Sequence, residues 1–111
     1  MGANAELFQR YYEAYKQGGA EAVADFFDPE VQWIATEPGP LDCHNREDVL
    51  QTMRSWKDDP QLEPDFEEIG DDSVLVAANT SQGQRLFTLL TLRDGKIVRM
   101  RDFRSRDEAL A

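Results

Sequence analysis

The segment GKIVRMRDFRS, residues 95–105, decides how the rest of the chain is interpreted. It begins at the dipeptide Asp94-Gly95, which is typical of a tight β-hairpin turn. The residues after the turn alternate and predict a strand that carries Val98, Met100 and Asp102 on one face and arginines on the other. A carboxylate in line with a valine and a methionine lies either at a frayed strand end or inside a pocket.

Three segments upstream predict further strands. They are LEPDFEEIG (62–70), DSVLVAANTSQ (72–82) and QRLFTLLTLR (84–93). Pro64 interrupts the first and places it at a sheet edge, and Gln82-Gly83 predicts a turn between the other two.

The first half of the chain predicts mostly helix. One helix begins at Asn4 and stops at Gly18-Gly19, a second covers 20–27, and a third begins at Asn45 and reaches Trp56. A short strand over 31–36 and the Pro-rich loop EPGPLDCH (37–44) separate the last two. Helices followed by an antiparallel meander predict an α+β domain, in which a curved sheet wrapped round the helices leaves a hollow.

The composition excludes some classes of binding partner. The 111 residues form a single domain, and the formal net charge of −10 argues against nucleic acid and anionic membranes. No apolar run or leader is visible, and Cys43 is the only cysteine, so we expect a cytoplasmic protein.

Several fragments resemble a known family. The order of elements and the fragments FFDPEVQW (26–33), NREDVL (45–50) and DGKIVRMRDF (94–103) resemble the nuclear transport factor 2-like fold, in its SnoaL-like and ketosteroid-isomerase-like branch. The resemblance covers residues 1–111 as one domain. It implies a cystatin-like conical barrel with N-terminal helices on a curved antiparallel sheet, often dimeric, holding a small apolar ligand in the cone.

The resemblance assigns roles residue by residue. Tyr11 occupies the place of the tyrosine that, in ketosteroid isomerases, hydrogen-bonds an enolate oxygen. The general-base aspartate and the second oxyanion donor fall at Ala35 and Thr88, so steroid isomerisation by that arrangement is not expected. The polyketide-cyclase branch keeps an acid–base aspartate on the last strand, and Asp102 lies at that position.

Asp102 therefore has two interpretations. In a pocket, partial desolvation raises its pKa, and it can exchange protons at carbon while Tyr11 donates to an oxyanion. Alternatively it is a structural acceptor at the strand end, bonded by Tyr15 or an arginine.

Two other groups carry possible chemistry. His44, the only histidine, lies just ahead of the third helix, either as a proton shuttle at the cone mouth or as an exposed helix-entry residue. Cys43 has no nearby base and is expected to be a buried filler. The acids, Cys43 and His44 of this loop lack ligand spacing, so no metal or other cofactor is predicted.

A set of side chains is expected to line the pocket and contact a ligand. It comprises Tyr15, Trp33, Met53, Trp56, Asn79, Thr88, Val98 and Met100. For each the alternative is an ordinary core residue or, for Asn79, a turn hydrogen bond.

The outer sheet face predicts assembly. Phe87, Leu89 and Phe103 lie there beside Arg99 and Arg101, an apolar area that favours a two-fold homodimer. Three functions remain open: a binding domain for a small apolar molecule, an acid–base isomerase or cyclase using Asp102 and Tyr11, and a dimeric protein-interaction module.

Overall fold

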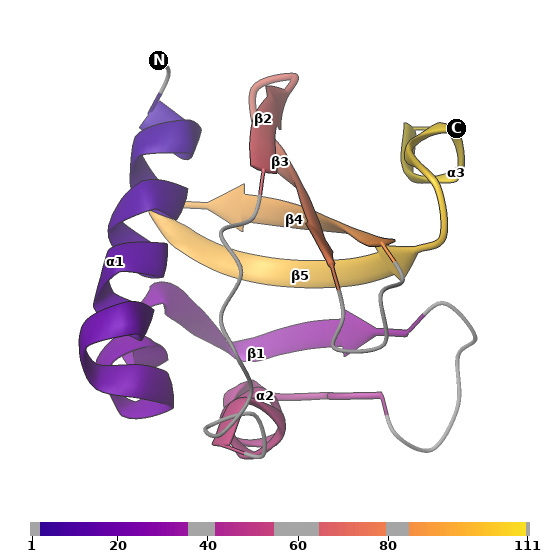
Figure 1. The fold of residues 1–111 in the computed structure, drawn as a ribbon. Coiled ribbons are helices and arrows are strands. Elements are labelled where there is room, and N and C mark those ends of the chain that lie inside the picture. Colours follow the sequence, from indigo (N-terminus) through magenta and orange to yellow (C-terminus); the bar gives the residue numbers. More distant parts are fainter. Residues whose placement is uncertain (1–2, 36–41, 55–64, 80–84, 111) are drawn as a thin grey trace.

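The computed structural model describes residues 3–35, 42–54, 65–79 and 85–110 (Figure 1). Its strands are β1 (Phe27–Ile34), β2 (Asp65–Ile69), β3 (Ser73–Asn79), β4 (Arg85–Arg93) and β5 (Lys96–Phe103). Its helices are α1 (Ala3–Val23), the 3-10 helix η1 (Ala24–Phe26), α2 (Arg46–Arg54) and α3 (Arg106–Leu110). The expected α+β class is confirmed.

The five strands form one sheet in the order β1-β5-β4-β3-β2. The pairs from β2 to β5 are antiparallel, but β1 runs parallel to β5, so the sheet is mixed and not wholly antiparallel. The chain leaves β1 at one edge, passes through α2, and re-enters the sheet with β2 at the opposite edge (Figure 1). β2 is therefore the edge strand that Pro64 predicted.

The N-terminal helix changes direction at Gly19, whose backbone angles (φ 72°, ψ −156°) are not helical. The two expected helices are thus present on either side of this glycine, but the second becomes a 3-10 turn and ends at Phe26. β1 begins at Phe27, four residues before the expected start, and includes Pro29. Proline is tolerated because β1 lies at an edge of the sheet.

The hairpin between β4 and β5 has the predicted turn. Asp94 and Gly95 both have positive φ, 54° and 78°, as a type I′ turn requires. A β-bulge follows, because Leu92 pairs with Ile97 and Thr91 pairs with Arg99, which leaves Val98 without an opposite residue.

This bulge decides which residues of β5 face the helices. Ile97 and Met100 are both buried in the core, although they are three positions apart, because Val98 shifts the alternation by one residue. Asp102 follows Met100 on the inner face, while Arg99 and Arg101 are exposed on the other. Val98 itself is half-buried at the bulge rather than on one face with Met100 and Asp102.

The core lies between the inner face of the sheet and helices α1 and α2. It is built from buried side chains of both helices and of four strands, among them Leu7, Phe8, Val31, Val49, Leu50, Met53, Val74, Leu90, Ile97 and Met100. α2 begins where the sequence predicts, since the Asp48 backbone N–H donates to Asn45 Oδ1 at 2.9 Å.

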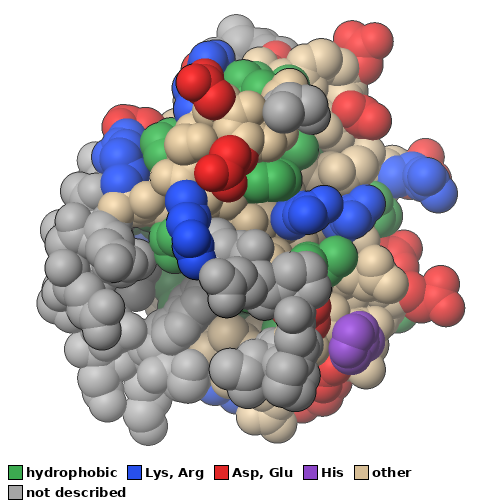
Figure 2. Space-filling model, turned by 90° about the vertical axis from the view of Figure 1, so that its right-hand side faces the viewer, with side chains coloured by type: hydrophobic (Ala, Val, Ile, Leu, Met, Phe, Trp, Pro, Cys, Tyr) green, Lys and Arg blue, Asp and Glu red, His purple; other side chains and the backbone are tan. Residues whose placement is uncertain are grey.

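The outer face of the sheet is partly covered by α3, which the sequence analysis did not predict. Ala109 of this helix is buried, and the Arg106 side chain donates a hydrogen bond to Glu67 of β2 at 2.6 Å. In the part of the chain that the structure describes, Leu110 is the one large hydrophobic residue that is exposed. The face seen in Figure 2 accordingly shows hydrophobic side chains interspersed with charges of both signs.

Candidate functional site

Asp102 is the centre of a hydrogen-bonded group on the inner face. Its Oδ1 accepts a hydrogen bond from the indole Nε1 of Trp33 at 3.0 Å and another from Thr88 Oγ1 at 2.8 Å. All three residues are half-buried. Asp102 thus accepts hydrogen bonds, as the structural-acceptor interpretation expects, but the donors are Trp33 and Thr88 instead of Tyr15 or an arginine.

Three adjacent strands bring these side chains together. β5 lies between β1 and β4, and Thr88 is directly opposite Asp102 in the β4–β5 ladder. Trp33 pairs with Met100, two residues before Asp102, so its long side chain reaches the carboxylate diagonally. The group therefore rests on rigid strand backbone and not on a loop.

The electrostatics of Asp102 combine opposing effects. Partial burial raises the pKa of its carboxyl, the hydrogen bonds from Trp33 and Thr88 lower it part of the way back, and the like charge of Asp42 raises it. The net pKa is above the usual range of an aspartate. No lysine or arginine within the described residues contributes to this shift.

The segment before α2 supplies the next neighbours. Cys43 is buried and forms a two-way backbone bridge with Trp33, at 3.0 and 2.9 Å. Burial raises the pKa of its thiol, the contact with Thr52 lowers it, and Asp48, Asp42 and Asp102 raise it further. The thiol therefore stays protonated, in agreement with its expected role as a filler.

Tyr11 lies at the other end of the inner face. Its ring contacts Phe26 and Phe27 edge-on, with centroids 5.8 and 5.6 Å apart. Phe27 pairs with Ile97, five residues before Asp102, which is roughly 15 Å along a strand. Burial, and then the neighbouring Tyr15, raises the pKa of Tyr11, so its phenol keeps its proton at neutral pH. The structure does not bring Tyr11 and Asp102 into contact.

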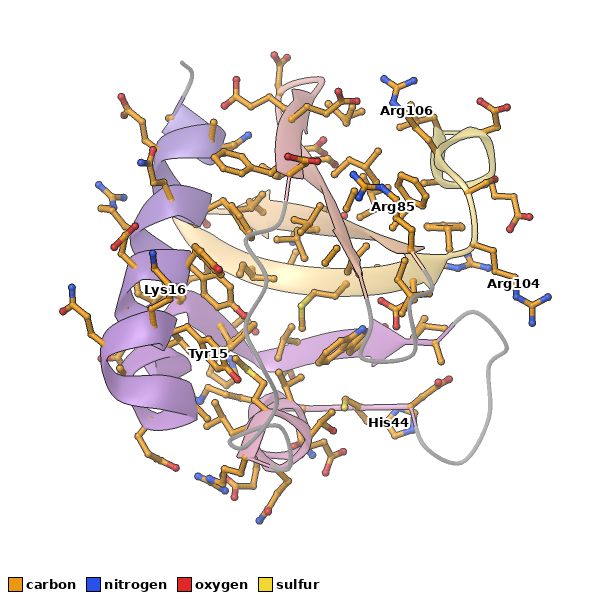
Figure 3. All side chains as sticks on the ribbon, in the orientation of Figure 1. Tyr15, Lys16, His44, Arg85, Arg104 and Arg106 are labelled. Atoms are coloured by element: carbon orange, nitrogen blue, oxygen red, sulfur yellow. The ribbon has the colours of Figure 1, made fainter. Side chains whose placement is uncertain are left out.

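The remaining predicted residues are dispersed. Met53 and Met100 are buried core residues, and Tyr15 is half-buried on the part of α1 that faces α2 (Figure 3). His44 is exposed at the end of the molecule opposite α1 (Figures 2 and 3). Trp56 and the side chain of Asn79 lie outside the described residues.

Sequence reasoning missed two features of this site. The first is Asp42, whose negative charge raises the pKa of Asp102. Nothing in the sequence indicated this role, because acidic residues are common in loops. The pairing of Thr88 with Asp102 depends on the bulge at Val98, which alternation alone does not reveal.

The outer face holds a separate shallow groove of about 170 Å³ between β2 and α3. Leu75, Ala77 and Phe87 line it, and ion pairs of Arg85 with Asp65 and of Arg106 with Glu67 lie along it. Figure 3 shows both arginines at this end of the molecule. The groove does not include Asp102 or its donors.

No cluster of three or more histidine, cysteine or acidic side chains among the described residues is placed to hold a metal ion. None of the described helices has the length and apolar character needed to cross a membrane.

Solved structures share this fold. A nuclear transport factor 2-like protein of unknown function from Burkholderia pseudomallei matches with a TM-score of 0.71 and 19% identity, over 99% of this chain and 96% of its own. A putative ketosteroid isomerase from Kribbella flavida gives 0.70 and 23%, over 91% of this chain and 76% of its own. A putative SnoaL-like polyketide cyclase from Mesorhizobium loti gives 0.59 and 20%, over 92% and 99%.

Sequence comparison gives the family. No curated protein matches the chain. The model of the SnoaL-like domain, however, matches residues 8–100, which is most of the chain. The chain shares the fold of a nuclear transport factor 2-like protein and belongs to the SnoaL-like domain family.

Proposed function

We propose that the protein binds a small, largely apolar molecule against the inner face of its sheet, with Asp102 as the polar contact. The observation that carries this proposal is a half-buried carboxylate among buried apolar side chains, fixed by Trp33 and Thr88 and not neutralised by any cation among the described residues. A carboxylate placed in this way costs free energy at neutral pH, and such arrangements cluster at functional sites. The activity itself remains unassigned.

A native mass spectrometric screen tests the binding proposal. The protein is incubated with a small-metabolite extract and with a panel of neutral apolar compounds, and a one-to-one adduct is expected. Asp102→Asn should weaken the adduct, because the charged acceptor is lost, whereas the matched change Asp107→Asn at an exposed position of α3 should leave it unchanged. Absence of any adduct contradicts binding, and an adduct indifferent to Asp102→Asn contradicts the role of this carboxylate.

The acid–base alternative rests on the raised pKa of Asp102. In this interpretation Asp102 is an isomerase-like or cyclase-like acid–base group, and Tyr11 donates to an oxyanion. Because Tyr11 packs about five residues away along β5, a substrate that contacts both groups must extend along much of the inner face. His44 is exposed and sits apart from both, so we give it no role in this step.

We infer in addition that two copies associate through the outer sheet face. Leu89 is half-buried there beside the exposed Arg99 and Arg101 on β5, while Asp65 and Glu67 lie on β2 at the other side of the face. A two-fold axis through this face sets β5 of one copy near β2 of the other, where Arg99 and Arg101 would join the ion pairs that Asp65 and Glu67 already form within their own chain. Since α3 covers part of the face, the contact uses the part that it leaves free.

Sedimentation at micromolar concentration tests the dimer. We expect a dimer for the wild-type protein and a monomer for Leu89→Asp, because the new charge would be buried in the interface. Leu110→Asp, at the exposed end of α3, is the control and should remain dimeric. A wild-type monomer at these concentrations contradicts the proposed assembly.

We propose in addition that the protein is cytoplasmic, because its one cysteine has no second cysteine in the sequence with which to form a disulfide.

A further inference from the structure

The two oxygens of the Asp102 carboxylate are in different situations. Oδ1 accepts both hydrogen bonds, from the Trp33 indole at 3.0 Å and from the Thr88 hydroxyl at 2.8 Å. No group in the described ranges donates a hydrogen bond to Oδ2. The asymmetry is built into the fold, because the two donors come from the strands that flank β5 on either side.

An oxygen that accepts two hydrogen bonds is a poor place for a proton. The indole N–H is a donor only, so a proton on Oδ1 would face it without any acceptor. The Thr88 hydroxyl can turn to become an acceptor, but the indole N–H cannot accept a hydrogen bond in any orientation. A protonated Asp102 therefore carries its proton on Oδ2.

We infer that Trp33 and Thr88 are positioning residues that hold Oδ1 in two hydrogen bonds. Oδ2 is then the atom through which Asp102 contacts its ligand and exchanges a proton. The inference rests on the proposed function and deepens it. It also changes the expected roles of Trp33 and Thr88, which the sequence suggested as direct ligand contacts. In this arrangement they hold the carboxylate and the ligand meets its second oxygen.

The surroundings of Oδ2 define the class of ligand. Asp42 is the charged side chain that acts on the Asp102 carboxyl, and the nearby Cys43 thiol stays protonated. Arg101 lies on the opposite face of β5, over the ring of Phe103. An anionic ligand at this carboxyl would therefore be repelled by Asp42 and by Asp102 itself. The site selects a neutral, largely apolar molecule that presents an O–H or N–H donor to Oδ2, such as an enol or a phenol.

Carboxyl titration by ¹³C NMR tests the positioning role without any ligand. In Thr88→Val and in Trp33→Phe, the pKa of Asp102 is expected to rise above that of the wild-type protein, because each change removes a hydrogen bond to the charged form. Thr88→Ser restores the hydroxyl and should restore the wild-type pKa. Thr91→Val, the same change on the outward side of β4, is the control and should leave the pKa unaltered.

The indole signal of Trp33 gives a second readout in the unmodified protein. Its Nε1–H resonance should shift with pH at the midpoint of the Asp102 carboxyl, since the bond weakens when the carboxylate is protonated. If the chemical shift of Trp33 Nε1–H does not change as Asp102 titrates, the inference is overturned, even if one of the variants fails to fold. A ligand screen without adducts would refute the proposed function instead, so that the two failures are distinguishable.

Ligand charge provides the last check. Within matched pairs from one scaffold, the neutral phenol should bind, and the corresponding carboxylate should bind at least tenfold more weakly. Equal or tighter binding of the carboxylate contradicts the ligand class inferred from Oδ2.

Discussion

Replacing Phe27 by alanine is expected to lower the free energy of unfolding by about 3–5 kcal/mol. Phe27 is fully buried where η1 enters β1, and it pairs with Ile97, which is also fully buried. Its ring lies edge-on to that of Tyr11, with centroids 5.6 Å apart. The substitution therefore opens a cavity between α1 and the sheet at a point where strand backbones limit collapse.

Urea denaturation followed by circular dichroism measures this effect. Phe103→Ala is the matched control, since Phe103 is only half-buried on the outer face and its removal opens no enclosed cavity. The loss for Phe103→Ala should be clearly smaller. Equal losses would show that the inner face is not the main core, and the position of Tyr11 against Phe27 would then lose its support.

Local signals predicted the Asp94-Gly95 turn and the start of α2, whereas Asn4 lies inside α1 and the Gln82-Gly83 turn lies outside the described residues. Asp94-Gly95 required two positive φ angles and has them, and Asn45 caps α2 through its side chain. Such features depend on a few adjacent residues, so a sequence shows them directly. The same kind of signal was overlooked at the C-terminus, where Ser105 and Glu108 have the spacing of a capping box and Ser105 Oγ accepts the Glu108 N–H at 3.2 Å.

Features that depend on residues far apart in the chain were harder to predict from the sequence. The parallel pairing of β1 with β5 joins segments about 70 residues apart, and alternation in either strand says nothing of the partner's direction. The early start of β1 was hidden by Pro29, which is a breaker in a central strand and is tolerated at an edge.

The candidate site was predicted in part. Alternation placed Asp102 with Met100 on the inward face, and the structure agrees. A regular hairpin counted from the Asp94-Gly95 turn would set Thr88 opposite Arg101, and only the bulge at Val98 moves it opposite Asp102. Without that extra residue, burying Ile97 would also turn Arg99 and Arg101 inward. One bulge therefore gives the inner face an acid in place of an arginine.

Asp102 itself supports the sharpest test of what this acid does. Asp102→Ala is expected to lower the free energy of unfolding by about 1–3 kcal/mol, because the Trp33 indole and the Thr88 hydroxyl both lose their acceptor. Asp102→Asn keeps an acceptor oxygen in the place of Oδ1 and removes only the charge. At pH 7 this variant should be at least as stable as the wild-type protein.

The pH dependence follows from the direction of the pKa shift. Burial raises the pKa of Asp102 in the folded protein above its unfolded value of about 3.9, so the folded state holds the proton more tightly. The charged carboxylate then costs stability at neutral pH, and the cost disappears as the pH falls through the folded pKa. The advantage of Asp102→Asn over the wild type should accordingly shrink between pH 7 and pH 5.

Thermal melts of wild type, Asp102→Asn and Asp102→Ala at both pH values decide the matter, with Asp107→Asn as the exposed control. An asparagine variant as unstable as the alanine variant at pH 7, with a deficit that shrinks at pH 5, would show that the ionised carboxylate is needed to hold Trp33 and Thr88. Asp102 would then be a structural acceptor whose charge stabilises the folded chain. The hydrogen bonds from Trp33 and Thr88 would then stabilise the ionised carboxylate, and proton exchange with a ligand at Oδ2 would not be expected.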